Sequence, residues 1–251
     1  MKHKVHTKTI ASEREINNRL EFLKKYKSNP IPDNEQLANL GLFFKRQELS
    51  KILFLDEIYR QIVNVHGVII EFGVRWGSNL VTLNNLRGIY EPYNYSRKII
   101  GFDTFSGFPV LNNKDGKHEV IKKGSFSVSE NYEKYLLELL DYHQSESPLS
   151  HINKNFLYKG DASKTFQQYL KEHPEAIIAF AYFDFDIYEP TQKCLKLLLP
   201  HMPKGAIIGF DELTDPHFPG ETVALKEVMK LRHSRLVRSK FSAIQSYIIL
   251  E

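Results

Sequence analysis

The sequence predicts an α/β fold of the Rossmann-like class, in which helices cover both faces of a mostly parallel, seven-stranded sheet. Short apolar runs that suit buried strands alternate with segments of helical spacing from residue 67 onward, and this alternation is typical of a parallel sheet. The last two apolar runs succeed each other with no helix between them, which predicts an antiparallel strand at the C-terminal edge. With 251 residues, 42% of them hydrophobic, the chain has the length and composition of one such domain with an N-terminal helical extension.

The extension is expected to span residues 1–66. Residues 1–30 are charged, and the segment Asn-Pro-Ile-Pro-Asp at 29–33 separates them from the next part of the chain. From residue 34 to about 65, leucine, isoleucine and phenylalanine recur at mostly helical spacing. This spacing predicts two helices before the first strand, as a cap on a larger core.

The α/β domain is expected to span residues 67–251, because no linker divides it. Each predicted strand is a short apolar run, and each predicted helix carries its apolar residues at helical spacing. Ser127 and Ser129 are the candidate N-caps of the amphipathic helix in the middle of the domain. The predicted strands are 68–72, 98–102, 156–158, 177–183 and 205–210, with a terminal pair at 236–240 and 246–250, and the predicted helices are 78–86, 129–142, 163–172, 191–199 and 222–231.

Composition excludes several classes of protein. The net charge of +4 is spread along the chain, and the basic clusters lack interleaved aromatic residues, so no nucleic-acid partner is expected. The apolar runs are far shorter than the roughly 20 residues of a membrane helix, and the basic N-terminus leads into no apolar segment, so neither a membrane span nor a secretory signal is expected. The single cysteine, Cys194, excludes an internal disulfide and favours a cytoplasmic location; we expect it to be a packed, inert thiol.

Candidate ligand-binding residues come after the first two strands, at the edge where doubly wound sheets bind their ligands. Glu71, Gly73 and Gly77 form a glycine-rich turn that lets the backbone approach a ligand, and Ser78 opens the next helix. The G-x-x-x-G spacing disfavours a nicotinamide cofactor, which calls for G-x-G-x-x-G. Asp103, at the end of the second strand, could accept both ribose hydroxyls of a nucleoside or could cap a turn.

Further acids come after the next three strands. After Gly160, Asp161 could bind an adenine amino group or cap the following helix, and both roles stay open. After the fourth and fifth strands, carboxylates cluster at adjacent strand ends and repel one another unless a positive charge compensates. A hard divalent cation such as Mg²⁺ would do so, whereas pairing with lysine or arginine, or exposure to solvent, is the alternative. The clustered acids are Asp184, Asp186, Asp211 and Glu212.

These motifs make the sequence similar to the sugar O-methyltransferases typified by macrocin O-methyltransferase, and most similar to the branch that acts on deoxyhexoses such as nucleotide-linked rhamnose. The similarity extends from about residue 67 to residue 251. It rests mainly on FDTFSGFP at 102–109 and DFDIYEPT at 184–191, with support from EFGV…G at 71–77, GFDEL at 209–213 and FPGET at 218–222.

The resemblance implies S-adenosylmethionine as methyl donor, a Mg²⁺ ion and a sugar hydroxyl as acceptor. By motif, Asp186, Asp211 and Glu212 match the metal ligands of the family. Two departures stand out: the macrolide enzymes carry paired aspartates where this chain has Asp211-Glu212, and Trp-Arg where it has Arg75-Trp76. The predicted donor site, in which Ser78 could hold the methionine carboxylate, comprises Glu71, Gly73, Gly77, Ser78, Asp103, Gly160, Asp161 and Asp184.

We therefore expect a cytoplasmic, metal-assisted O-methyltransferase that acts on a small-molecule deoxyhexose, either nucleotide-linked or part of a glycan or glycosylated natural product. Asp186 is the first candidate for the general base, and His118, in the polar loop at 109–124, is the second, with a plain surface histidine as its alternative. A catechol-type O-methyltransferase and a catalytically inactive scaffold are the competing functions. The sugar, the hydroxyl and the oligomeric state, including a homo-oligomer, stay open.

Overall fold

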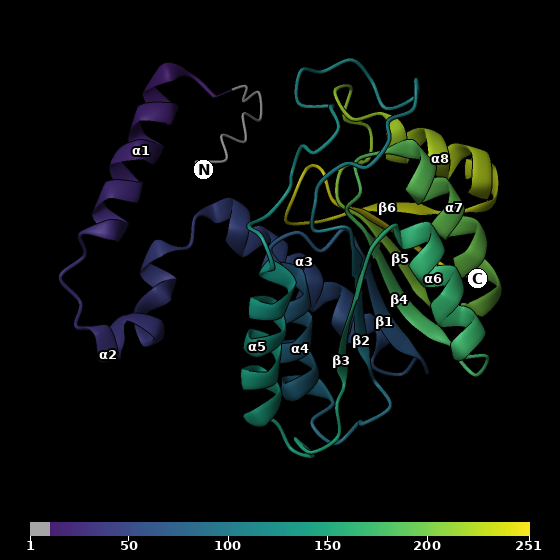
Figure 1. Cartoon of the computed structure of the whole chain (residues 1–251), viewed down its shortest axis with the longest axis horizontal. Helices are drawn as coiled ribbons and strands as arrows, with labels where there is room; N and C mark the ends of the chain where they lie inside the picture. Colours follow the sequence, from purple (N-terminus) through teal and green to yellow (C-terminus); the bar gives the residue numbers. More distant parts are fainter. Residues whose placement is uncertain (1–10) are drawn as a thin grey trace. The chain divides into compact units, whose positions relative to one another are not determined.

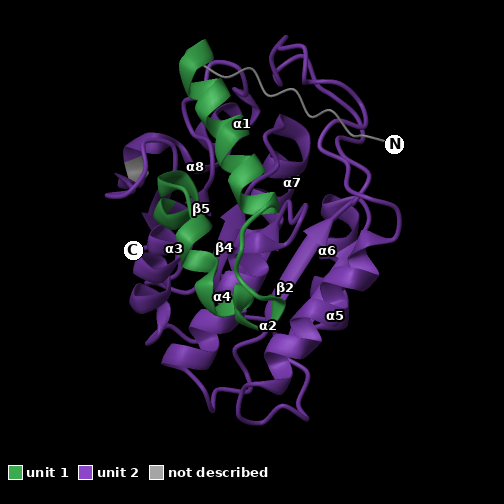
Figure 2. Cartoon of the chain, turned by 90° about the vertical axis from the view of Figure 1, so that its left-hand side faces the viewer, with its two compact units in different colours: residues 1–50 green, residues 51–251 purple. Residues whose placement is uncertain are grey.

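The computed structural model describes residues 11–251, apart from the side chain at position 233. Contacts divide the chain into two compact units, residues 1–50 and residues 51–251 (Figure 2). The basic N-terminus up to residue 10 lies outside the described residues. The boundary falls within helix α3 (Arg46–Ile62), so this helix belongs to the second unit from Lys51 onward, whereas the sequence suggested an extension up to residue 66.

The first unit contains α1 (Glu13–Lys27), α2 (Asp33–Gln36) and the 3₁₀ helix η1 (Leu37–Phe43). Helix α1 begins with a capping box, in which the Ser12 hydroxyl accepts from the Glu15 amide and the Glu15 carboxylate accepts from the Ser12 amide at 2.8 Å. The ring of Tyr26 packs edge-on against Phe43, with centroids 5.0 Å apart. The sequence prediction missed α1, whose apolar positions are not buried.

The second unit is built on one seven-stranded sheet with the order β3-β2-β1-β4-β5-β7-β6 (Figure 1). Strands β1 to β5 run parallel, and β7 pairs antiparallel with both β5 and the edge strand β6. The predicted Rossmann-like, mostly parallel sheet with an antiparallel C-terminal end is thus confirmed. The strands are β1 (Val68–Phe72), β2 (Ile99–Asp103), β3 (Asn155–Lys159), β4 (Ile178–Phe183), β5 (Ile207–Phe210), β6 (Leu236–Arg238) and β7 (Ser246–Ile249).

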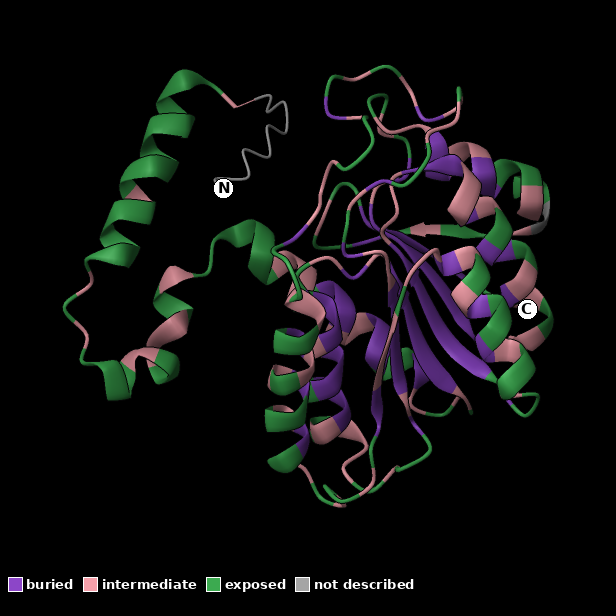
Figure 3. Cartoon of the chain, viewed as in Figure 1, coloured by how far each residue is buried: buried purple, intermediate pink, exposed green. Residues whose placement is uncertain are grey.

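Helices cover both faces of this sheet (Figure 1). Alternate residues of β1 enter opposite cores: Ile69 packs with residues of α3, α4 and α5, and Ile70 packs with residues of α6, α7 and α8. Strands β1, β4 and β5 are buried along their whole length (Figure 3). Each large apolar side chain buried there contributes about 1.5–3 kcal/mol to stability. The remaining helices are α4 (Ser78–Tyr90), α5 (Tyr132–Ser145), α6 (Ala162–Glu172), α7 (Tyr188–Leu198) and α8 (Gly220–Met229).

The start of α5 differs from the prediction. The helix begins at Tyr132 rather than near Ser127 or Ser129, and its N-cap is Asn131, which has a left-handed backbone and makes no side-chain cap. Asparagine adopts this conformation more readily than most residues, because its short polar side chain can hydrogen-bond locally. The loop between β2 and α5 is correspondingly longer than expected.

A buried arginine ties the end of α3 to the start of β1. The Arg97 guanidinium donates to the carbonyls of Ile62 (3.0 Å), Val65 (2.9 Å) and Gly67 (2.5 Å), and it pairs with Glu91 at 2.8 Å. Carbonyls at a helix C-terminus have no partner within the helix, so Arg97 satisfies groups that burial would otherwise leave unpaired. This arrangement holds α3 against the sheet.

Cys194, on α7, is fully buried, and this burial raises the pKa of its thiol well above the ordinary value. The residue packs in the core as expected. In the part of the chain that the structure describes, no helix combines the length and the apolar character needed to cross a membrane.

Candidate functional site

The predicted site residues come after strands that lie side by side in the sheet. Backbone hydrogen bonds continue past the strand ends: the Gly73 amide donates to Phe102 O of β2 at 3.0 Å, and the Asp184 amide donates to the last carbonyl of β1 at 2.8 Å. The Asp211 amide donates to the last carbonyl of β4 at 3.0 Å. The segments that succeed β1, β2, β4 and β5 are therefore neighbours at the carboxyl edge of the sheet.

The two glycines of the turn after β1 lie where an added side chain would clash. Gly73 has φ +90°, and a Cβ on it would lie 2.1 Å from the Asp184 carbonyl oxygen. Gly77 has φ +79°, and a Cβ there would lie 2.4 Å from a methyl group of Leu136. Glycine is favoured at both positions because other residues rarely adopt this backbone conformation, and at Gly73 the clash would be with backbone atoms. Ser78 is the first residue of α4 and is exposed.

Glu71 lies fully buried in β1, and only one of its two carboxylate oxygens has a hydrogen-bond partner among the described residues. Its Oε1 accepts a hydrogen bond from the Asn79 side chain at 2.6 Å, and its Oε2 has no partner among the described residues. Burial raises the pKa of Glu71 well above its ordinary value, and the charges of Asp184 and Asp103 raise it further. A buried carboxylate oxygen without a partner is costly, so Glu71 is suited to receive a donor group from a ligand.

Asp103, the last residue of β2, is held by the backbone. Its Oδ2 accepts from the Arg75 amide at 2.8 Å, and its Oδ1 accepts from the Phe105 amide at 2.5 Å. Burial raises the pKa of Asp103, and these amides offset part of the rise. The turn-capping role is therefore present, and each carboxylate oxygen retains further acceptor capacity for a ligand.

Asp161 caps the helix that comes after β3. Its Oδ1 accepts from the Ser163 amide at 3.0 Å at the start of α6. The preceding Gly160 has φ +143°, and its amide donates to Asp103 O at 2.8 Å. The capping alternative is thus observed, and the turn lies beside the end of β2.

The acids after β4 and β5 lie close enough to raise one another's pKa. Burial raises the pKa of Asp184 to about 6, with Asp211 as the next cause. Burial raises the pKa of Glu212 to about 7, with the Asp211 charge adding to it. Burial likewise raises the pKa of Asp186 well above its ordinary range, followed by the charges of Asp184, Glu212 and Glu221. The structure thus brings the predicted acids into one acidic region, which consists of Asp184, Asp186, Asp211 and Glu212.

The sequence prediction missed Glu221, at the start of α8. This fully buried carboxylate accepts from the Phe185 amide at 2.9 Å and the Asp186 amide at 3.3 Å, and its Oε2 has no partner among the described residues. It therefore fixes the backbone at Asp186, which has a left-handed φ of +62°. The motif at 218–222 contains Glu221 and could have drawn attention to it.

The prediction also missed Lys51, whose ammonium group lies between two of the acids. Its Nζ is 3.3 Å from Asp184 Oδ2 and 3.1 Å from Asp211 Oδ1. The same Asp211 oxygen accepts from the Tyr182 hydroxyl at 2.5 Å and from Gln245 Nε2 at 2.9 Å. Burial alone would raise the pKa of Asp211, but Lys51 and these hydrogen bonds lower it. No sequence pattern marks Lys51, which is one of several lysines on charged helices.

The predicted metal ligands are not arranged as a metal-binding group. Within residues 11–251, as described, no three histidine, cysteine, aspartate or glutamate side chains are placed to hold a metal ion. Asp186, Asp211 and Glu212 share the acidic region, but Asp211 already pairs with Lys51. Pairing with a lysine, one of the alternatives open at the sequence level, is therefore present at this position.

His118 lies in the loop after β2, where its ring packs beside the segment that leads into α8. Its Nδ1 accepts weakly from the Val120 amide at 3.4 Å, and its ring meets that of His217 at 5.0 Å. Its Nε2 is buried without a partner among the described residues. The loop itself is anchored, because the Asp115 carboxylate accepts from the Tyr188 amide at 2.5 Å. None of the described contacts of His118 is with the acidic region.

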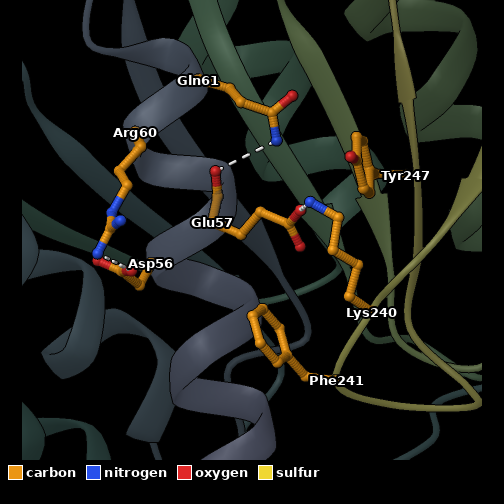
Figure 4. Close-up of a pocket in the computed structure, with 7 residues that line it drawn as sticks. All are labelled: Asp56, Glu57, Arg60, Gln61, Lys240, Phe241 and Tyr247. Atoms are coloured by element: carbon orange, nitrogen blue, oxygen red, sulfur yellow. Dashed lines mark hydrogen bonds and ion pairs between the residues drawn. The ribbon is translucent and has the colours of Figure 1, made fainter.

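A separate pocket of about 420 Å³ lies between α3 and the C-terminal strand pair (Figure 4). An ion pair of 2.7 Å between Lys240 and Glu57 crosses it. The residues that line it are Asp56, Glu57, Arg60, Gln61, Lys240, Phe241 and Tyr247, none of which is a predicted site residue.

Comparison with solved structures finds close relatives. CalS11, a calicheamicin methyltransferase, is 40% identical with a TM-score of 0.93, and the match covers 96% of this chain and 94% of that one. An apo structure of CalS11, described as TDP-rhamnose 3′-O-methyltransferase, is 38% identical with a TM-score of 0.84 and covers 96% of each chain. The O-methyltransferase NovP, at 16% identity, a TM-score of 0.59, and 80% and 79% coverage, shares the fold.

No protein-family model and no curated protein matches the chain. The structural relatives nevertheless share more than a third of their residues with this chain over nearly its whole length. They are also of the kind that the motifs at 102–109 and 184–191 indicated. The chain therefore belongs to the family of S-adenosylmethionine-dependent sugar O-methyltransferases that includes CalS11.

Proposed function

We propose that this protein transfers a methyl group from S-adenosylmethionine to a hydroxyl of a nucleotide-linked deoxyhexose. The observation that carries the proposal is the 40% identity to CalS11 over 96% of the chain, since that relative is described as acting on TDP-rhamnose. The site is consistent with this chemistry, because a glycine turn and buried acids share the carboxyl edge of the sheet, where such folds bind nucleosides.

The residues after β1 and β2 suit the methyl donor. In the methyl donor, the methyl group is bonded to a positively charged sulfur. The acceptor oxygen attacks the methyl carbon, and the sulfur leaves as a neutral thioether. The free Oε2 of Glu71 could accept from its ammonium group, and the bare backbone at Gly73 allows close approach. The carboxylate of Asp103 is the proposed partner of the ribose hydroxyls. Gly77, Ser78, Gly160, Asp161 and Asp184 complete the proposed donor site.

Asp186 is the proposed general base. Methyl transfer needs the acceptor oxygen, the methyl carbon and the sulfur in line, and positioning of this kind contributes about 7–11 kcal/mol. Removal of the hydroxyl proton by a placed base adds a factor of about 10²–10⁴. Asp186 lies in the acidic region with its backbone held by Glu221, whereas the described ring contacts of His118 are with His217 and Phe218 and not with these acids. We therefore place Asp186 before His118 as the base.

We further propose that a bound divalent cation assists the methyl transfer. Asp186, Asp211 and Glu212 are hard oxygen donors of the kind that Mg²⁺ prefers, and they come after the adjacent strands β4 and β5. A bound Mg²⁺ ion would polarise the acceptor hydroxyl and orient it. We expect EDTA to inhibit methyl transfer and added Mg²⁺ to restore it, as measured by initial rates. Equal rates with and without EDTA would argue for a metal-free reaction.

The proposed function can be tested by methyl uptake from labelled donor into a panel of acceptors. The panel should contain several nucleoside diphosphate deoxyhexoses, the matching free sugars and a catechol. We expect a mass gain of one CH₂ group only in nucleotide-linked deoxyhexoses. A product from the catechol alone would favour a catechol-type enzyme, and failure to bind S-adenosylhomocysteine in calorimetry would favour an inactive scaffold.

A further inference from the structure

Arg75, in the glycine-rich turn after β1, has a guanidinium group without a partner. Within the described part of the chain, this group neither pairs with a carboxylate nor donates a hydrogen bond, and its Nε is buried. Its central carbon lies 4.9 Å from the centre of the Phe126 ring. Burial raises the pKa of Asp103, and the Arg75 charge lowers it only as a minor cause, so these two side chains interact without pairing. A buried donor without a partner is costly, and guanidinium groups match carboxylates and phosphates in shape, so the group is suited to an anionic ligand.

The contact between Arg75 and Phe126 joins two residues with unusual backbone conformations. The angle φ is +50° at Arg75 and +63° at Phe126, although neither residue is glycine. Arginine and phenylalanine rarely adopt this left-handed conformation, and they keep it only where the surrounding structure enforces it. Strain of this kind is concentrated at active sites and ligand clamps. The backbone is therefore a second observation that points to a ligand at this contact.

The guanidinium group of Arg75 lies between the donor site and the acceptor side. The Arg75 amide donates to Oδ2 of Asp103, the proposed ribose partner, at 2.8 Å. Phe126 belongs to the loop between β2 and α5, and the centre of its ring lies 6.3 Å from that of Phe218. Phe218 is part of the segment between β5 and α8, which begins with Asp211. An anion bound to Arg75 would therefore lie beside both the donor site and the segment of the proposed acceptor groups.

Basic residues near Phe126 favour an anion with more than one negative charge. Lys122 and Lys123 precede Phe126 in the same loop, and both are exposed. The loop is fixed here by a hydrogen bond of 3.0 Å from the Phe108 amide to Ser125 O. A diphosphate carries several negative charges, which Arg75 and these lysines can share, whereas the carboxylate of the methyl donor carries one.

We propose that Arg75, supported by the ring of Phe126, binds the diphosphate group of the nucleotide-linked acceptor. The inference rests on the proposed function and deepens it, because it assigns a residue to the nucleotide part of the substrate. The planar fork of donors can reach two phosphate oxygens at once, and the aromatic ring supports the guanidinium from one face. The donor carboxylate is the other anion of the reaction, and Ser78 is its proposed partner. Arg75 thus selects nucleotide-linked sugars over free sugars.

The test is calorimetry on the full chain with two kinds of ligand: the thymidine, uridine and guanosine diphosphates, and S-adenosylhomocysteine. The variants are Arg75→Met, Arg75→Lys and the control Arg60→Met, which removes an exposed arginine that pairs with Asp56 at 2.7 Å. We expect Arg75→Met to bind the preferred nucleoside diphosphate at least about tenfold more weakly, because charge-assisted hydrogen bonds are lost. Its affinity for S-adenosylhomocysteine, which has no phosphate, should stay within about threefold. Arg75→Lys keeps the charge and should recover part of the loss, and Arg60→Met should match the wild type with both ligands.

Kinetics and a double-mutant cycle separate diphosphate binding from a structural role. Arg75→Met should raise KM for the nucleotide-linked deoxyhexose about tenfold and leave kcat within about threefold, because the diphosphate does not react. Phe126→Leu should weaken nucleoside diphosphate binding about two- to fivefold through the lost support of the ring. The same change should have little further effect in the Arg75→Met background. Additive losses would overturn the role of Phe126.

Three results would overturn the role of Arg75. Weaker binding of S-adenosylhomocysteine in Arg75→Met, with nucleoside diphosphate binding intact, would assign Arg75 to the donor carboxylate instead. Unchanged affinity for both ligands would remove Arg75 from substrate binding. Equal losses of both affinities and of melting temperature in Arg75→Met and Arg75→Lys would assign Arg75 a structural role only.

Failure of the proposed function has a different signature. A wild-type protein that binds a nucleoside diphosphate but methylates no deoxyhexose would refute the acceptor assignment, and calorimetry on Arg75→Met would still decide whether Arg75 binds the diphosphate. A wild-type protein that methylates a deoxyhexose but binds none of the three nucleoside diphosphates would overturn the role of Arg75. The methyltransferase function would then stand without it.

Discussion

Replacing Asp186 by asparagine is expected to lower methyl transfer by about 10²–10⁴-fold, the usual contribution of a placed general base. Asparagine has almost the same shape as aspartate but cannot take up the hydroxyl proton. It also tolerates the left-handed backbone of Asp186, φ +62°, so the loop after β4 should keep its path. Binding of S-adenosylhomocysteine, measured by calorimetry, should change by less than about threefold, because the base acts on the acceptor.

The matched control for this variant is Asp141→Asn, which removes an exposed carboxylate from α5. We expect its turnover to equal that of the wild type. Wild-type turnover in Asp186→Asn would remove Asp186 from the mechanism and make His118 the next residue to test. A parallel loss of S-adenosylhomocysteine binding would instead assign Asp186 to the donor site.

Replacing Gly73 by alanine should disrupt the donor site. The added methyl group would lie 2.1 Å from the Asp184 carbonyl oxygen, so the end of β1 or β4 must move. The left-handed backbone costs about 1–2 kcal/mol for alanine, and forced overpacking adds about 1–3 kcal/mol. We expect the free energy of unfolding to fall by the sum of these costs and S-adenosylhomocysteine affinity to fall at least about tenfold.

Gly124→Ala provides the control, because Gly124 has a similar φ of +81° but open space around its Cβ position. It should show only the backbone cost, about 1–2 kcal/mol, with donor affinity intact. Chemical denaturation and calorimetry on both variants give the comparison. Equal behaviour of the two variants would mean that the close approach at Gly73 has no part in donor binding.

The strands of the α/β domain could be predicted closely from the sequence. The run at 68–72 matches β1, and those at 177–183 and 205–210 contain β4 and β5. Strands covered on both faces need apolar residues at every position, so they stand out as continuous runs. The first helix, α1, was missed although the sequence marks it, with a capping box at Ser12 and Glu15 and apolar residues at helical spacing from Ile16 onward.

The proximity of several acids in the candidate site could be predicted from the sequence, because it depends on where the strands end. Glu71, Asp103, Asp184 and Asp211 lie at the ends of parallel strands, and such strands end at one edge of a sheet, so their proximity is a consequence of the fold class. The side-chain partners could not be predicted. Asp161 caps its own helix, and Glu221 reaches back from α8 to the loop after β4.

Fold class, family and the acids of the carboxyl edge can all be read along the chain, because apolar periodicity and short motifs are local properties. Which charges meet is a property of the folded molecule only. Lys51 and Asp184 are 133 positions apart, and they meet because the apolar residues of α3 pack against the sheet in the same core as residues of β1 and β4. Electrostatic pairing depends on distance in space, and no local pattern in the chain encodes it.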